Sequence, residues 1–80
     1  MKAIVNVFLK PGVLDSQGKA VHHALSSLHF DNVKDVRVGK QIVLQLDESD
    51  PQKAREEVKE MCEELLANTV IEDYTIEIEQ

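Results

Sequence analysis

The sequence contains few of the residues that form cross-links, metal sites or stacking surfaces. Its 80 residues include one cysteine, no tryptophan, one tyrosine and two phenylalanines. A single cysteine cannot form a disulfide within the chain, so a disulfide framework is excluded. Because so few aromatic side chains are present, the chain lacks a stacking platform for nucleic-acid bases. The sequence therefore predicts a protein that does not bind nucleic acid.

Positive charge and long apolar runs are also scarce. Nine Lys and Arg residues stand against 15 Asp and Glu residues, which gives a formal net charge of −6 and no basic cluster for phosphates. No apolar run approaches the roughly 20 residues that cross a bilayer. The first residues carry neither a basic segment nor a long apolar segment of the kind that directs secretion. We expect a cytoplasmic protein without membrane contact.

The spacing of apolar residues predicts a single domain, residues 1–80, with elements in the order βαββαβ. Alternating apolar residues predict strands at residues 3–9, 33–38, 41–46 and 74–79. Residues 15–29 and 50–68 show helical spacing, with Asp15, Asp50 and Pro51 at the positions that begin helices. This order predicts an α+β, two-layer ferredoxin-like sandwich, in which a four-stranded antiparallel sheet carries two helices on one face.

Two local patterns refine this prediction. Gly39 and Lys40 separate the second and third predicted strands, and glycine in the first position favours a two-residue hairpin with a type II′ turn. The apolar face of the second helix is predicted to contain Ala54, Val58, Met61, Cys62 and Leu65. The other face of this helix is rich in glutamate with interspersed Lys and Arg, which is typical of a solvated surface.

The uncovered face of the predicted sheet is unusually apolar at its centre. Strand alternation places Ile4, Phe8 and Val43 on this face, beside polar side chains. An exposed apolar centre favours burial against a partner, and an 80-residue domain is marginal alone because it buries only about 60% of its unfolded surface. We therefore expect this face to be buried in a homo-oligomer. The alternative is an ordinary scatter of exposed apolar residues.

No arrangement of residues in the sequence predicts a catalytic, metal or cofactor site. Cys62 lies within an apolar helical pattern, so a small buried side chain is the better interpretation than a nucleophile. His22 and His29 are about two helical turns, roughly 10 Å, apart, so one metal cannot bridge them. The glycines do not match a phosphate-binding loop. We expect no catalytic residue, no bound cofactor and no bound metal in this chain.

The loop between the first strand and the first helix is more elaborate than a connector requires. Lys10, Pro11, Gly12 and Asp15 are candidates for contact with a partner, and Arg37 and Lys40 are candidates near the predicted hairpin. Alternatively, Lys10-Pro11-Gly12 forms a plain turn and Asp15 a helix N-cap. The corresponding alternative for Arg37 and Lys40 is that they are solvated charges that pair with nearby carboxylates.

Four segments together resemble the PurS family, the small subunits of bacterial and archaeal phosphoribosylformylglycinamidine (FGAM) synthase. They are KPGVLDSQGKAV at residues 10–21, VRVGK at 36–40, MCEELLAN at 61–68 and IEDY at 71–74. Each motif is weak alone, but their order and spacing cover nearly the whole chain. Ser16 and Thr69 depart from the family pattern, which often has proline at these turn or helix-end positions.

The resemblance implies a non-catalytic subunit of a glutamine-dependent ligase in purine biosynthesis. In this family PurQ hydrolyses glutamine to ammonia. PurL uses ATP and magnesium to convert formylglycinamide ribonucleotide (FGAR) and ammonia to FGAM, ADP and phosphate. PurS joins PurQ to PurL as a dimer and binds no cofactor itself, and we expect this chain to be a homodimer or a tetramer.

Two other classes of function remain open from the residues alone. A small-ligand regulatory module of ferredoxin-like fold would bind its ligand at a dimer interface, where Lys10-Pro11-Gly12 is the candidate loop. A stand-alone enzyme would show activity without any partner, and it would need the catalytic residues that the sequence does not offer.

Overall fold

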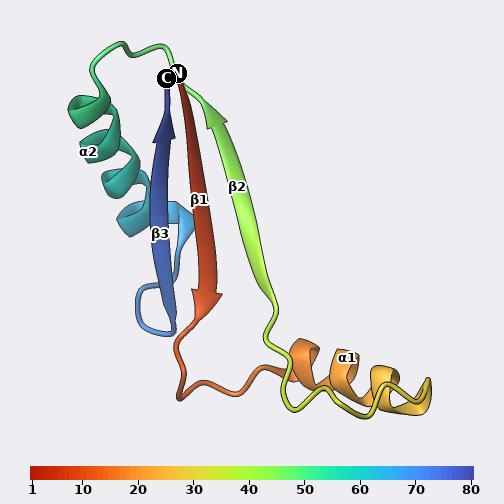
Figure 1. Ribbon diagram of the computed structural model, residues 1–80. Coiled ribbons are helices and arrows are strands. Elements are labelled where there is room, and N and C mark those ends of the chain that lie inside the picture. The colour runs from red at the N-terminus through yellow and green to blue at the C-terminus, as the bar shows by residue number, and fades with distance from the viewer.

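The computed structural model describes all residues, 1–80. It contains a three-stranded antiparallel sheet with strand order β2–β1–β3 and two helices, the second of which ends in a π-helical turn (Figure 1). The elements are β1 (Lys2–Leu9), α1 (Ser16–Ser27), β2 (Gly39–Gln45), α2 (Pro51–Met61), the π-helical turn η1 (Cys62–Leu66) and β3 (Glu72–Glu79).

The small core lies between the sheet and α2. Strand alternation points Ala3, Val5 and Val7 of the central strand toward α2, and all three are buried. They pack with Val58 and Cys62 of the helical segment. The Asp50 side chain accepts a hydrogen bond from the Gln52 N–H (3.1 Å) and caps α2, as the sequence predicts. Neither α1 nor α2 has the length and apolar character needed to span a membrane.

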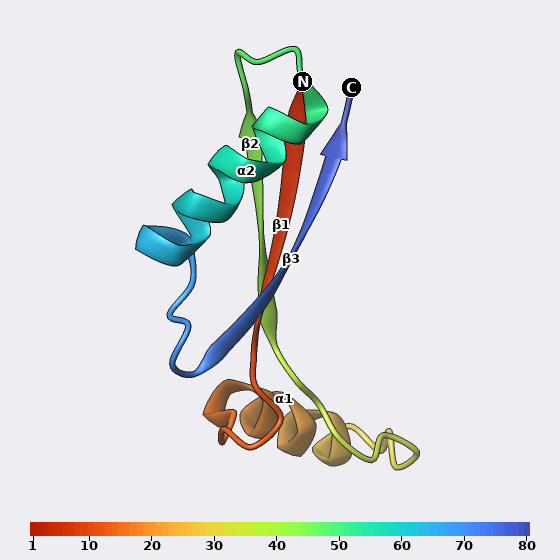
Figure 2. The ribbon, with the colours of Figure 1, turned by 90° about the vertical axis from the view of Figure 1, so that its left-hand side faces the viewer.

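Residues 10–38 project from one end of the sheet, and we call this segment the arm (Figures 1 and 2). It comprises the loop into α1, α1 itself and the return chain, residues 28–38. It gives the molecule extents of 49 × 26 × 14 Å and a radius of gyration of 16.0 Å. A compact chain of this length has a radius of gyration of about 12 Å. The arm therefore lies outside the packed body of this single chain.

The return chain corrects three sequence predictions. Residues 33–38 form no strand, and Gly39 and Lys40 are not a hairpin turn but the first residues of β2, paired with Phe8 and Val7 of β1. The return chain instead lies against α1, where His22 Nε2 lies 2.8 Å from the Val33 carbonyl oxygen. Residues 33–38 add no fourth strand, so the sheet of the single chain has three strands. Because α1 lies away from the sheet, only α2 covers it.

The end of α2 differs from the predicted apolar face. Ala54, Val58 and Cys62 are buried as predicted, but Met61 is 37% exposed and Leu65 is 82% exposed. The backbone N–H of Ala67 donates to the Cys62 carbonyl (3.1 Å), five residues earlier, so the last turn is wider than an α-helical turn. This extra residue rotates Leu65 away from the core.

Helix α1 begins and ends where the sequence predicts. Asp15 is its N-cap, and the chain reverses at His29, which has a φ of 70°. The Phe30 N–H donates to the Leu25 carbonyl and the His29 N–H to the Ser26 carbonyl (both 3.0 Å), which is a Schellman motif. A non-glycine residue therefore occupies a left-handed backbone conformation at the tip of the arm.

Candidate functional site

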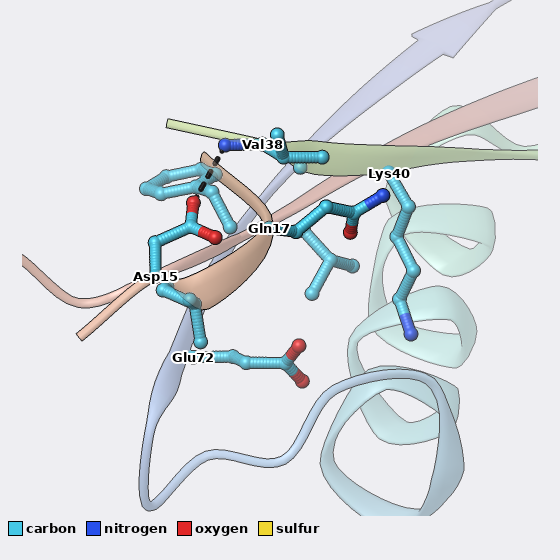
Figure 3. A pocket seen from close by; sticks show the side chains of 9 residues that line it. Asp15, Gln17, Val38, Lys40 and Glu72 are labelled. Atoms are coloured by element: carbon cyan, nitrogen blue, oxygen red, sulfur yellow. Dashed lines mark hydrogen bonds between the residues drawn. The ribbon is translucent and has the colours of Figure 1, made fainter. Parts of the chain in front are cut away.

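The junction between the arm and the sheet is organised by one buried carboxylate. Asp15 is 5% exposed; its Oδ1 accepts the Gly18 N–H (2.8 Å) and its Oδ2 accepts the Val38 N–H (2.7 Å) (Figure 3). The backbone hydrogen bonds from Val38 and Gly18, helped by the positive charge of Arg37, hold the pKa of Asp15 below its usual value. Asp15 thus caps α1 and also fixes the residue that leads into β2.

Arg37 secures the loop that enters the arm. Its Nη1 donates to the Val13 carbonyl and its Nη2 donates to the Lys10 carbonyl, both at 3.0 Å. The guanidinium therefore binds backbone oxygens rather than the carboxylates considered in the sequence analysis. These two bonds occupy N–H groups that could otherwise bind a partner protein. Contact of Arg37 with a partner stays a prediction.

A shallow cavity of about 230 Å³ lies beside this junction (Figure 3). Residues from β1, β2, β3 and the start of α1 line it, and Gln17, Lys40 and Glu72 contribute its longer polar side chains. Lys40 is exposed and forms no ion pair within the chain, so its ammonium group is free for an external contact. Glu72 already accepts a hydrogen bond from the Asn68 N–H (2.7 Å).

The remaining loop candidates lie at the surface. Lys10 Nζ lies 4.0 Å from Asp73 Oδ1, which gives a weak exposed ion pair. Pro11 and Gly12 are exposed at the turn, and no atom lies within 4 Å of the position that a Gly12 side chain would occupy. The structure thus brings Asp15 and Arg37 together at the junction and leaves Pro11 and Gly12 open to solvent.

The uncovered face of the sheet has the composition that strand alternation predicts. Ile4 pairs with Val43 across the strands, Val43 is 50% exposed and Phe8 is 41% exposed. Beside them, the side chain of Asn6 on β1 bonds to both neighbouring strands. Gln41 Nε2 on β2 donates to Asn6 Oδ1 (3.0 Å), and Asn6 Nδ2 donates to the Thr75 hydroxyl on β3 (3.4 Å). Burial of this face in a homo-oligomer stays a prediction.

The arm carries exposed apolar side chains that the sequence did not predict to be exposed. Leu14 and Leu28 are each 65% exposed, Phe30 is 54% exposed and Val21 is 40% exposed. The helical spacing over residues 15–29, to which Val21 and Leu28 belong, predicted an apolar face packed on the same chain's sheet. Because the arm leaves the sheet, this surface has no cover within the chain.

Cys62 occupies an environment that suppresses thiol chemistry. Its side chain is fully buried in the core, and burial, together with the nearby Glu63 carboxylate, raises the pKa of the thiol. A neutral, inaccessible thiol is a poor nucleophile. In the whole chain no group of three or more His, Cys, Asp or Glu side chains is placed to hold a metal ion.

Comparison with known proteins identifies the family. The family model described as PurS, phosphoribosylformylglycinamidine (FGAM) synthase, matches residues 2–80. The chain belongs to the PurS family. It is 54% identical to the PurS subunit of Bacillus subtilis over 79 residues, which cover 99% of this chain and 93% of that protein. It is 46% identical to the PurS subunit of Methanocaldococcus jannaschii, over 99% of this chain and 95% of that protein.

Solved PurS structures share the fold. The C2 crystal form of B. subtilis PurS superposes with a TM-score of 0.89 at 54% identity and covers 99% of this chain and 98% of that one. A chain in the structure of PurLQS from Thermotoga maritima gives a TM-score of 0.87 at 36% identity, covering 95% and 93%. As a PurS protein, the chain is a subunit of FGAM synthase, a glutamine-dependent ligase complex of purine biosynthesis.

Proposed function

We propose that this chain is a non-catalytic subunit that joins the glutaminase PurQ to the ATP-dependent synthetase PurL. The observation that carries this proposal is its similarity, over 95% of the chain, to a protein of the T. maritima PurLQS structure. The chemically reactive side chains of the arm junction and of the core support the same role. Asp15 and Arg37 form hydrogen bonds with backbone atoms, and Cys62 is buried. These side chains therefore stabilise the fold and are not available to react with a substrate.

Such a subunit is needed because two separate reactions share ammonia. PurQ releases ammonia from glutamine, and PurL consumes it with ATP and magnesium while it converts FGAR to FGAM. Free ammonia is largely protonated at neutral pH and diffuses away, so transfer depends on holding the two sites in one oriented assembly. The chain contributes this positioning in the cytoplasm and binds neither ATP nor magnesium itself.

Two copies of the chain together form the ferredoxin-like sandwich that one copy lacks. The order β2–β1–β3 leaves the outer edge of β2 unpaired, and α2 is the only helix over the sheet. The arm contains the missing helix and residues 33–38, a segment outside the helices and strands that leads directly into β2. The arm of a second copy, laid beside α2 and along this edge, gives four strands with two helices on one face.

Charge and apolar surface support this exchange. The arm, residues 10–38, carries four basic and three acidic side chains, whereas residues 47–80 carry twelve acidic and three basic ones. The arm of one copy therefore meets a body of opposite charge. Val21 on α1 and Leu28 at its C-cap are exposed. Ile42 and Leu44 on the helix-covered face of β2 are half-buried, so both surfaces gain from burial.

The arm exchange is tested by the mass of the protein in solution. Size-exclusion chromatography with light scattering should show two or four times the 9.0 kDa of one chain. Val21→Asp should shift the protein toward the monomer, because it places a charge in the contact. His23→Asp, on the solvated side of the same helix, should not. A monomeric wild-type protein, or equal masses for both variants, would contradict the exchange.

The joining role is tested by mixing PurL and PurQ of the same organism with and without this chain. We expect a complex containing all three proteins only when the chain is present. If PurL and PurQ associate equally well without it, the proposed role is wrong.

A further inference from the structure

Gly39 and Lys40 lie where the arm meets the sheet. In the structure both belong to β2, paired with Phe8 and Val7 of β1, and no glycine has a positive φ. The same two residues, with glycine first, favour a type II′ turn, in which the first residue has a positive φ. Two backbone states are therefore compatible with Gly39 and Lys40: a straight passage from the arm into β2, and a reversal of the chain.

The straight state depends on glycine at residue 39. A Cβ atom at this position would lie 2.8 Å from the Val7 carbonyl oxygen and 3.4 Å from the Phe8 Cβ atom. A larger residue would therefore strain the pairing between β1 and β2, whereas a turn at the same place would release residue 39 from this contact.

The arm is a unit with its own internal contacts. Asp15 accepts a hydrogen bond from the Val38 N–H, and His22 Nε2 lies 2.8 Å from the Val33 carbonyl oxygen. These contacts would be kept if the whole arm turned about its junction with the sheet. The bond between Asp15 and Val38 also holds the chain that enters the arm beside the chain that leaves it, so both connections lie at one end of the sheet (Figures 1 and 2).

Few contacts set the direction of the arm relative to the sheet. The Lys10 N–H donates to the Ile71 carbonyl (2.9 Å), and Lys10 Nζ forms the weak ion pair with Asp73. Both contacts involve the first residue of the arm, and α1 makes no extensive contact with a strand or with α2. The pairing of Gly39 and Lys40 with β1 is therefore the main restraint that keeps the arm extended.

The arm has the dimensions needed to cover the sheet of its own chain. Helix α1 has 12 residues and is about 18 Å long, and residues 33–38 would span about 20 Å as a strand. Residues 10–14 form a loop of ordinary length between a strand and a helix. A reversal at Gly39 and Lys40 would thus lay α1 beside α2 and residues 33–38 along the free edge of β2 in the same chain.

We infer that Gly39 and Lys40 form a hinge at which the arm can fold back onto its own sheet, so that a closed monomer is the alternative to the dimer with exchanged arms. This inference rests on the arm exchange proposed above. The same contacts form between two copies when the hinge is straight and within one copy when it is turned, which is the relation seen in domain swapping.

The hinge decides which state forms. Closure within one chain has an effective concentration in the millimolar range, so a more dilute protein would close unless the hinge opposed the turn. The pairs that Gly39 and Lys40 form with β1 exist only in the straight state, and they favour the exchanged dimer.

The test changes the hinge and measures the mass in solution. Gly39→Asn with Lys40→Gly supplies the Asn-Gly pair that favours a two-residue hairpin, and the new Cβ atom strains the straight state. A second variant inserts two glycines between Gly39 and Lys40, which lengthens the hinge without adding a side chain. In size-exclusion chromatography with light scattering, both variants should halve the mass, to the 9.0 kDa of one chain for a dimeric wild type.

The control inserts two glycines after Asp47, in the loop between β2 and α2. This insertion leaves the hinge unchanged and costs little, because the entropy of loop closure grows slowly with length, so the wild-type mass should be kept. Small-angle X-ray scattering then identifies the closed chain. Its radius of gyration should be about 12 Å, the value for a compact chain of this length, against 16.0 Å with the arm extended.

The outcomes separate this inference from the proposed function. If the wild type contains two or four chains and both hinge variants keep its mass, the hinge is wrong and the arm exchange stands. Hinge variants that are single chains with an extended arm, or that lose the helical circular dichroism signal, would also overturn the hinge. A wild-type protein with the mass of one chain would overturn the arm exchange and this inference with it. The joining of PurL to PurQ is measured separately, by complex formation with the wild-type chain.

Discussion

Gly18→Ala tests how the arm is held to the sheet. Gly18 is buried in the first turn of α1, where the return chain crosses the helix. A Cβ atom at this position would collide with the backbone carbonyl of Val36 and would lie 2.8 Å from Asp15 Oδ2. Both neighbours resist displacement, because one is main chain and the other is fixed by hydrogen bonds from Gly18 and Val38.

The magnitude follows from two opposing effects. Alanine favours a helix over glycine by about 1 kcal/mol, whereas an added methyl group in a packed site costs about 1–3 kcal/mol. Because a main-chain carbonyl must move, the cost lies in the upper part of that range. We expect Gly18→Ala to lower the free energy of unfolding by about 1–2 kcal/mol, and each kcal/mol lowers Tm by roughly 4–8 °C.

Urea unfolding followed by circular dichroism, at one fixed protein concentration, measures this effect. Gly12→Ala is the control, because Gly12 has no neighbour within 4 Å and does not have a positive φ. This control should be unchanged, or more stable by about 0.4–1 kcal/mol. If Gly18→Ala is as stable as the wild type, the close crossing of α1 and the return chain is wrong.

Three further substitutions test separate features. Arg37→Lys should speed proteolytic cleavage in the loop at residues 10–14, because lysine cannot donate to two carbonyls as the guanidinium does. Unchanged cleavage would show that the two Arg37 hydrogen bonds do not hold this loop. Tyr74→Phe should be less stable than the wild type up to about pH 10. The difference should disappear as pH rises through 12, because the hydrogen bond to Glu63 raises the pKa of Tyr74 to about 12 and requires the protonated phenol. A difference that persists above pH 12 would refute this origin. His29→Gly should raise the free energy of unfolding by about 1 kcal/mol, because glycine adopts the left-handed backbone without strain; lower stability would contradict the Schellman end.

Local signals predicted most of the elements. Asp15 and Asp50 mark the starts of the two helices because a cap depends on the next three residues of the chain. The alternation in β1 predicted which face is buried, because Val5 and Val7 point to α2 while Phe8 points away. The family resemblance, drawn from four short segments, is confirmed over residues 2–80.

The wrong predictions concern residues whose contacts lie far along the chain or whose helix departs from regular geometry. Residues 33–38 alternate as a strand does. Alternation shows only that the two sides of a segment face different environments, and it does not show which element the segment packs against. Here that element is α1. Leu65 was assigned to the core because helical spacing assumes 3.6 residues per turn, and η1 departs from it. The role of Arg37 rests on oxygens 24 and 27 residues away, for which the sequence carries no local signal.

The central claim is that this chain couples glutamine hydrolysis to amidine synthesis without a catalytic site of its own. The most direct test measures FGAM formation by PurL and PurQ, with ATP and magnesium, in the presence and absence of this chain. One series uses glutamine as the nitrogen donor and a parallel series uses an ammonium salt. We predict that the glutamine-dependent rate requires the chain, while the ammonium-dependent rate of PurL does not. Equal glutamine-dependent rates with and without the chain would contradict the account.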